Sequence, residues 1–289
     1  MAVEADQVRL TRRDDRWLAQ LPERRLAWFA AADAALPRLR VERRLLRVLE
    51  ARCRIPAPRV LVESADGGFD VRTMVPGDHD LTALLAHLRA DADGAQRIGT
   101  ALGHVLAELH TCVTAADVAA WIPHRPEWPR PRAWIAEHLP AVVADRALHA
   151  AADEVMARYD DALDHATERV LVHADLGLHN ATVDLVTFDI LGVFDWESAC
   201  WADPHLDFRY FIFEPGRFDT LDAALAVYEG STGRRLSRDR VLLDNAASAI
   251  GFLAFRDGVP AEEVWCGRTL AEDLQWTRTA IAYVMATRR

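Results

Sequence analysis

Lysine is absent from this sequence of 289 residues, so all 34 of its basic residues are arginine. Glycine does not occur before position 67, which excludes a glycine-rich phosphate loop near the start of the chain. The four cysteines form no C-x-x-C pair, so neither a zinc motif nor a dithiol redox motif is present. No run of 18 uncharged apolar residues occurs, and the charged first residues lack the apolar centre of a signal peptide. We therefore expect a cytoplasmic protein without membrane spans.

The composition that remains is that of an ordinary globular protein. Hydrophobic residues make up 51% and charged residues 27% of the chain, which excludes disordered and low-complexity classes. The length allows one large domain or two modest ones, with a full hydrophobic core. The formal net charge of −10 argues against duplex nucleic acid or an anionic membrane as the main partner. An acidic protein is better suited to a cationic small molecule.

The first 76 residues combine short strands with one helix. Apolar residues at helical spacing, between arginines and glutamates, predict a helix over 37–53. Pro76-Gly77 ends the segment, so we expect a small N-terminal lobe of residues 1–76. Short apolar stretches predict strands at 17–19, 26–29, 59–63 and 69–75.

Residues 77–289 are predicted to form a larger and mostly helical lobe. Apolar strands at 170–172 and 191–194 interrupt the helices, and prolines with tryptophans predict a loop over 121–134. The fold class expected from both parts is α+β. Helical periodicity predicts helices at 81–90, 94–111, 147–167, 205–213, 219–229, 238–255 and 261–286.

The most informative segment follows the strand at 170–172. It places His173, Asp175 and Asn180 in the pattern H-x-D-x-x-x-x-N, and the next strand leads to Asp195. The chain contains only two asparagines, so a chance match is rare. A carboxylate at a strand end can orient or deprotonate a hydroxyl group, and an asparagine oxygen with a second carboxylate supplies ligands that Mg²⁺ prefers.

These residues resemble the aminoglycoside phosphotransferase and choline kinase family, relatives of the protein kinases. The resemblance runs from about residue 41 to the C-terminus and is sharpest over 170–208. The run F-D-W-E at 194–197 looks like the family's metal-binding segment, and A-D-P-H-L-D-F at 202–208 is similar to its G-D-P-x-x-D-L segment. M-V-P-G at 74–77 resembles the family's hinge, and Glu42 occupies the place of its helix glutamate.

The resemblance implies a protein-kinase-like fold with two lobes. It also implies transfer of a phosphoryl group from ATP or GTP, with Mg²⁺, to a hydroxyl of a small molecule such as an antibiotic or amino alcohol. A cationic acceptor is favoured, and a nucleoside or a macrolide remains open. No nucleic acid or membrane is expected as partner, and both a monomer and a homodimer remain open. In these roles Asp175 is the catalytic base, and Asn180 and Asp195 hold the metal.

The resemblance assigns supporting roles to several other residues. The backbone of Met74 and Val75 would bind the nucleotide base. His173 would tie the catalytic loop to the core, and Asp207 would hydrogen-bond the backbone of that loop. Glu42 would form the ion pair that positions its helix.

The missing lysine is the main departure from the family pattern. The family normally has a lysine on the third strand, which pairs with the helix glutamate and reaches the nucleotide phosphates; here that position falls near Trp28. We predict that an arginine replaces it, either Arg25 on the same strand or Arg12 or Arg13 further upstream; the alternative is that all three face the solvent, and that Mg²⁺ and backbone amides suffice. An arginine presents a planar fork rather than a compact ammonium, so the geometry must differ. The alternatives are a pseudokinase that binds a nucleotide or ligand without transfer, and a helical binding protein with an accidental motif.

Overall fold

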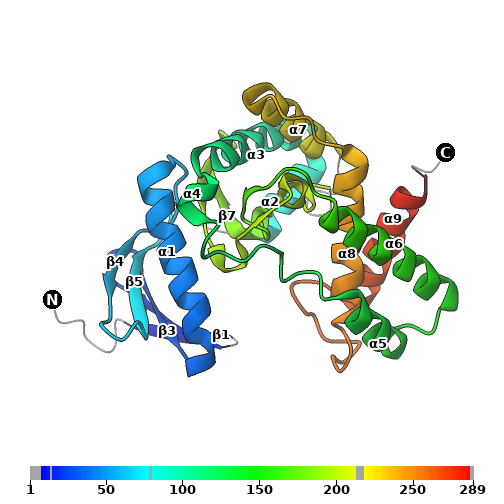
Figure 1. The fold of residues 1–289 in the computed structure, drawn as a ribbon, viewed down its shortest axis with the longest axis horizontal. Coiled ribbons are helices and arrows are strands. Elements are labelled where there is room, and N and C mark those ends of the chain that lie inside the picture. Colours follow the sequence, from blue (N-terminus) through cyan, green and yellow to red (C-terminus); the bar gives the residue numbers. More distant parts are fainter. Residues whose placement is uncertain (1–7, 14, 78–79, 213–217, 287–289) are drawn as a thin grey trace.

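The structure is a computed structural model that describes residues 8–13, 15–77, 80–212 and 218–286. Its N-terminal part is a five-stranded antiparallel sheet with the order β1-β2-β3-β5-β4, and the long helix α1 lies beside it (Figure 1). The strands are β1 (Arg9–Arg13), β2 (Arg16–Leu21), β3 (Arg25–Ala30), β4 (Val60–Glu63) and β5 (Phe69–Thr73), and α1 spans Leu36–Arg52. The strands predicted at 17–19, 26–29, 59–63 and 69–75 are confirmed, whereas β1, which is rich in arginine, was not predicted.

Helix α1 begins where the sequence predicts, with a proline in its first turn. Its apolar stripe is buried and includes Leu39, Leu45 and Leu49. The same helix also buries two charged side chains, Glu42 and Arg43, each 1% exposed. Because burying a charge is costly unless it is paired, these two side chains must have partners on the sheet.

The register of the sheet decides which side chains those partners are. Leu18 of β2 lies opposite Trp28 of β3, which lies opposite Asp70 of β5. Paired residues, and residues two apart on one strand, point to the same face of a sheet. Arg16, Trp28, Asp70 and Arg72 therefore share one face, and the ion pair between Arg72 and Glu42 shows that α1 covers it.

The rest of the chain is mostly helical. In the part of the chain that the structure describes, no helix is both long enough and apolar enough to cross a membrane. Helix α3 passes through the core and lies against α7 (Figure 1). The two helices approach so closely that a Cβ atom on Gly99 of α3 would overlap the carbonyl oxygen of Thr220 in α7. The helices are α2 (Leu81–Ala90), α3 (Ala92–Cys112), α4 (Ala115–Val118), α5 (Arg132–Val142), α6 (Arg146–Asp164), α7 (Phe218–Thr232), α8 (Arg238–Ala254) and α9 (Leu270–Ala286).

Four short strands carry the motif residues. They form two antiparallel pairs, β6 with β9 and β7 with β8. The segments between them hold three short 3-10 helices, η3 (Leu178–Asn180), η4 (Trp196–Ser198) and η5 (Pro204–Phe208). The strands are β6 (Val170–Val172), β7 (Ala181–Val183), β8 (Ile190–Val193) and β9 (Cys200–Ala202).

Two helix predictions and one loop prediction need correction. The helix expected over 205–213 is only the short η5, and residue 213 lies outside the described residues. The helix expected over 261–286 begins at Leu270, because Cys266 and Gly267 adopt positive φ angles of 49° and 74° that interrupt a right-handed helix. The loop predicted over 121–134 ends earlier than expected, because helix α5 begins directly after Pro131. Proline is well tolerated at the start of a helix.

Candidate active site

The loop over residues 173–180, which the sequence predicts to be catalytic, leaves β6 through a residue in an unusual backbone conformation. Ala174 has a φ of 63°, in the left-handed region that costs a non-glycine residue roughly 1–3 kcal/mol. The fully buried side chain of Arg209 donates from Nη2 to the carbonyl oxygen of Ala174. This contact holds the strained turn that directs the next residue, Asp175, out of the strand.

Asp207 fixes the same turn from the core side. Its Oδ1 accepts a hydrogen bond from the backbone N–H of Ala174 (2.7 Å), and its Oδ2 accepts one from the N–H of His173 (2.9 Å). The Nε2 atom of His110 in α3 lies 3.1 Å from Oδ2. Burial alone would raise the pKa of Asp207, but the hydrogen bonds and charges of His110 and His173 outweigh it and lower the pKa. Asp207 thus occupies the loop-bracing position that the sequence comparison implies.

His173 connects the loop to the end of β8. Its Nε2 lies 3.0 Å from the carbonyl oxygen of Phe194, and its Nδ1 accepts a hydrogen bond from the N–H of Asp175 (3.3 Å). The ring also packs on that of Trp196, with the ring centroids 4.5 Å apart, so the buried side chain of His173 connects the two motif segments.

Asp175 points into open space with its carboxylate held on one side. The side chain is 34% exposed, and its Oδ2 accepts a hydrogen bond from Nδ2 of Asn180 (2.9 Å). His179 lies 3.5 Å from the same oxygen. Burial would raise the pKa of Asp175, but the hydrogen bond and charge of His179, with Arg209 and His173, lower it overall. The carboxylate is therefore ionised near neutral pH.

Asp195 faces Asp175 from the end of β8. It has a φ of 64°, a second left-handed residue at the site, and the backbone N–H just before it, from Phe194, donates to the carbonyl of Asn180 (3.0 Å). Burial raises the pKa of Asp195, the negative charges of Glu42 and Asp175 add to this, and Arg16 opposes it. Among the described residues, its buried Oδ1 atom has no hydrogen-bond partner.

These features fit a magnesium ion. Within the described ranges, no three His, Cys, Asp or Glu side chains gather as a metal site of their own. Mg²⁺, however, is usually held by one or two protein groups together with substrate phosphates. The Nδ2 atom of Asn180 is committed to Asp175, which leaves the amide oxygen of Asn180 and the unpartnered Oδ1 of Asp195 as suitable hard ligands.

The three motif residues open onto one large cleft. It has a volume of about 1080 Å³, and Asp175, Asn180 and Asp195 line it together with residues of α2, α8 and α9. The structure therefore brings together the catalytic residue and both metal ligands that the sequence predicts.

The segment predicted to be the hinge, residues 74–77, follows β5 and precedes α2. The N–H of Met74 donates to the carbonyl of Arg24 (2.7 Å), and the carbonyl of Val75 accepts from the guanidinium of Arg24 (2.8 Å). Val75 also packs tightly, since a Cβ atom on Gly192 of β8 would overlap it. The carbonyl group of Met74 and the N–H group of Val75 have no hydrogen-bond partner among the described residues, so both are available to a ligand.

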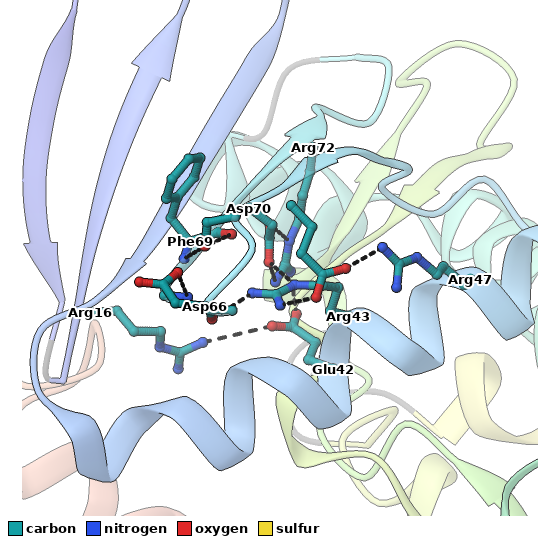
Figure 2. A network of polar contacts seen from close by, with 12 residues as sticks. Arg16, Glu42, Arg43, Arg47, Asp66, Phe69, Asp70 and Arg72 are labelled. Atoms are coloured by element: carbon teal, nitrogen blue, oxygen red, sulfur yellow. Dashed lines mark hydrogen bonds and ion pairs between the residues drawn. The ribbon is translucent and has the colours of Figure 1, made fainter.

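Glu42 is paired, but with arginines that the sequence did not single out. Its Oε1 lies 2.8 Å from Nη1 of Arg72 on β5, and its Oε2 lies 3.9 Å from Nη1 of Arg16 on β2 (Figure 2). Arg25 instead binds Glu23 (3.0 Å) and the carbonyl of Pro22 (3.1 Å). The cause is strand alternation: Arg25 is three residues from Trp28, so it points to the opposite face from α1. Arg12 is exposed on β1.

Comparison with known proteins places the chain in a family. A family model described as "Phosphotransferase enzyme family" matches residues 2–242. The chain belongs to this family. The resemblance found over 170–208 is thereby confirmed, and no curated protein sequence matches this phosphotransferase family member significantly.

Solved structures agree on the fold. The GDP complex of wild-type aminoglycoside 2'-phosphotransferase-IIIa superposes with a TM-score of 0.70 at 16% identity, covering 98% of this chain and 94% of that one. Macrolide 2'-phosphotransferase MphH from Brachybacterium faecium gives a TM-score of 0.63 at 20% identity, covering 98% and 93%. The "GDP and kanamycin complex of APH(2")-IIia" gives 0.69 at 16%, covering 100% and 94%. The predicted kinase-like fold, with a small sheet lobe and a mostly helical remainder, is confirmed.

Sequence reasoning missed Arg16, Arg72, Arg209 and His110. Each lies outside the motif segments and reaches the site from another element. A weak signal existed for Arg72, because the alternation D-V-R on β5 places it on the same face as Asp70. No local pattern distinguishes Arg209 or His110 from other polar residues.

Proposed function

We propose that this phosphotransferase family member transfers the terminal phosphoryl group of ATP or GTP to a hydroxyl group of a small molecule. The observation that carries the proposal is the meeting of Asp175, Asn180 and Asp195 on the wall of one cleft. Two carboxylates and an amide on the wall of one cleft suit phosphoryl transfer, which depends mainly on positioning and charge neutralisation.

Each residue has a defined task in this proposal. Asp175, ionised and partly exposed, accepts a hydrogen bond from the acceptor hydroxyl and takes its proton as the phosphoryl group is transferred. Asn180 and Asp195 would hold Mg²⁺, which neutralises charge on the phosphates. Asp207, His173 and Arg209 keep Asp175 in place. The Met74 and Val75 backbone would bind the purine.

The cleft also suggests the chemical class of the acceptor. Aromatic side chains dominate its wall on the side of α8 and α9, where Trp265 stacks on Phe255 at 5.0 Å. Aromatic surface of this extent favours a bulky and largely apolar ligand. The aromatic residues on this wall include Trp128, Phe252, Phe255, Trp265, Trp276 and Tyr283.

The charges on the cleft wall argue against a polycation. Besides Asp175 and Asp195, Glu272 is the only carboxylate among the described lining residues, and its Oε2 already accepts hydrogen bonds from Thr269. Arg268 lies over the rings of Phe252 (4.6 Å) and Trp276 (5.0 Å), so the protein's own cation occupies these π faces. Buried ammonium groups need paired carboxylates. A macrolide-like acceptor, which is bulky and largely apolar, therefore fits better than a polycationic aminoglycoside.

Transfer from labelled ATP or GTP to a macrolide and to kanamycin tests the proposal. We expect phosphorylation of the macrolide and little or none of kanamycin. Trp265→Ala should raise the acceptor KM severalfold, because it removes aromatic contact area from the wall. Trp17→Ala, on the exposed part of β2, is the matched control and should leave KM unchanged. Faster transfer to kanamycin would contradict the apolar acceptor but not the transferase activity.

The pseudokinase alternative makes a different prediction. Nucleotide binding raises the apparent melting temperature by mass action whether or not transfer follows. Thermal stabilisation by Mg-ATP or Mg-GTP, without product from any acceptor in a broad hydroxyl panel, would favour a pseudokinase. The absence of lysine is the observation that keeps this alternative in consideration.

A further inference from the structure

Two arginines and a glutamate, Arg16, Arg72 and Glu42, form a charged cluster between the sheet and α1 that can replace the missing lysine. The inference rests on the proposed use of a nucleotide. In the family pattern one lysine has two tasks: it pairs with the helix glutamate, and it contacts the phosphates. Here Trp28 stands near that position on β3, and the guanidinium groups of Arg16 and Arg72 both lie 5.0 Å from its ring. They reach Trp28 from the two neighbouring strands, β2 and β5.

Arg72 is fully engaged within the protein. Its Nη1 binds Glu42 at 2.8 Å, while its Nε and Nη2 bind the two oxygens of Asp70 at 2.6 and 3.1 Å (Figure 2). Arg43 of α1 also binds Asp70, at 3.0 Å. The side chains of Arg72, Glu42 and Asp70 are all at most 2% exposed. This network fixes α1 to the sheet. Because all three guanidinium nitrogens of Arg72 have partners within the protein, Arg72 is not available to bind a ligand.

Arg16 is engaged only in part. Its Nε binds Asp15 at 3.2 Å, and its Nη2 contacts Glu197, which lies two residues after Asp195. Its Nη1 lies 3.9 Å from Glu42, too far for a hydrogen bond, and has no hydrogen-bond partner among the described residues. The side chain is 7% exposed. A buried guanidinium with an unused donor is costly, unless a ligand supplies the acceptor.

The position of Arg16 identifies that ligand as an anion beside the metal site. Arg16 reaches from the sheet to the segment that carries Asp195, where its Nη2 atom contacts Glu197. Glu42, Asp195 and Glu197 surround this region with negative charge, so phosphates need a cation besides Mg²⁺. Among the described arginines, Arg16 combines an Nη1 donor without a hydrogen-bond partner with a contact to the segment that carries Asp195.

We propose that the two tasks of the missing lysine are divided between two arginines. Arg72 pairs with Glu42 and holds α1, and Arg16 donates a hydrogen bond from Nη1 to a phosphate of the bound nucleotide. This assignment replaces Arg25, Arg12 and Arg13, which the sequence suggested; the side chain of Arg13 lies outside the described part of the structure.

Binding measurements with phosphate-bearing and phosphate-free ligands test the division. Affinities of ATP, GTP, adenosine and guanosine are measured by calorimetry, with Mg²⁺, for the unmodified protein and for Arg16→Gln. Arg16→Gln should lose tenfold or more in affinity for the triphosphate and less than twofold for the matching nucleoside, because only the phosphate contact is removed. Arg9→Gln on exposed β1 removes the same charge from the same lobe and should change neither affinity.

Two further variants separate binding from folding. Arg16→Lys keeps a cation at the site and should retain more of the preference for triphosphate over nucleoside than Arg16→Gln. Arg72→Gln should lower the melting temperature by several degrees while keeping that preference. Unchanged triphosphate affinity in Arg16→Gln, or an equal loss for triphosphate and nucleoside, would overturn the assignment of Arg16 and leave the proposed function standing. Failure of the unmodified protein to bind any nucleotide would overturn both.

Discussion

Asp207 offers the sharpest test of how the catalytic loop is held. Replacement by Asn keeps the size of the side chain but exchanges one acceptor oxygen for an NH₂ donor. In the structure both oxygens accept hydrogen bonds from backbone N–H groups, those of Ala174 (2.7 Å) and His173 (2.9 Å). Whichever way the Asn side chain is oriented, one buried N–H group faces another donor and loses its partner.

The expected loss follows from these contacts. One buried N–H group left without a partner costs about 1–3 kcal/mol, and the other bonds are weakened because the acceptor is no longer charged. We therefore expect Asp207→Asn to lower the free energy of unfolding by about 2–4 kcal/mol at neutral pH.

The pH dependence of this loss adds a second constraint. The pKa of Asp207 is lower in the folded protein than in an unfolded chain, where it is about 4. Its contribution to stability is then present above the unfolded pKa and is lost as the pH falls through the folded pKa. The difference between the unmodified protein and Asp207→Asn should be largest near pH 7 and should shrink below about pH 4. His110 and His173 are the titratable groups that face Asp207.

Urea unfolding followed by tryptophan fluorescence measures both effects, since Trp196 packs directly on His173. Asp257→Asn, an exposed position after α8, is the matched control and should change the unfolding free energy by less than about 0.5 kcal/mol. A loss below about 1 kcal/mol in Asp207→Asn at pH 7, or a loss that does not shrink as the pH falls below about 4, would refute the bracing role.

Two further predictions concern packing and metal binding. Gly99→Ala should destabilise the protein by about 1–3 kcal/mol because the new methyl group overlaps the backbone of Thr220, whereas Gly230→Ala, which meets nothing within 4 Å, should be neutral or stabilising by up to about 1 kcal/mol. Equal urea midpoints for the two variants would contradict the close packing of α3 on α7. Asp195→Ala should abolish most of the Mg²⁺ dependence of nucleotide affinity and leave Mg²⁺-free binding nearly unchanged; an unaltered Mg²⁺ dependence in calorimetry would show that Asp195 is not a ligand.

The catalytic segment could be predicted from the sequence because its information is local. His173, Asp175 and Asn180 fall within eight residues, and the strand that leads to Asp195 follows closely. The helix that carries Glu42 was also predictable, since its apolar stripe is continuous.

The partners of these residues depend on contacts between distant segments. Arg72 meets Glu42 only because β5 pairs with β3 in a register that sets Trp28 opposite Asp70. A shift of one residue in that register would turn Arg72 to the opposite face. Arg25 looked suitable because it begins the third strand, but its side chain points away from α1. Such contacts are set by tertiary packing, and no short pattern encodes them.

The central claim is that this phosphotransferase family member transfers phosphate with Asp175 at the acceptor hydroxyl. Its most direct test is the rate of labelled phosphoryl transfer from ATP or GTP to a hydroxyl acceptor, measured for the unmodified protein and for Asp175→Asn alongside their nucleotide affinities. We expect product from the unmodified protein, and a rate lower by about 10²–10⁴-fold in Asp175→Asn with nucleotide affinity within about twofold. A near-normal rate in Asp175→Asn would contradict the role of Asp175, and absence of product from the unmodified protein with every acceptor would contradict the claim itself.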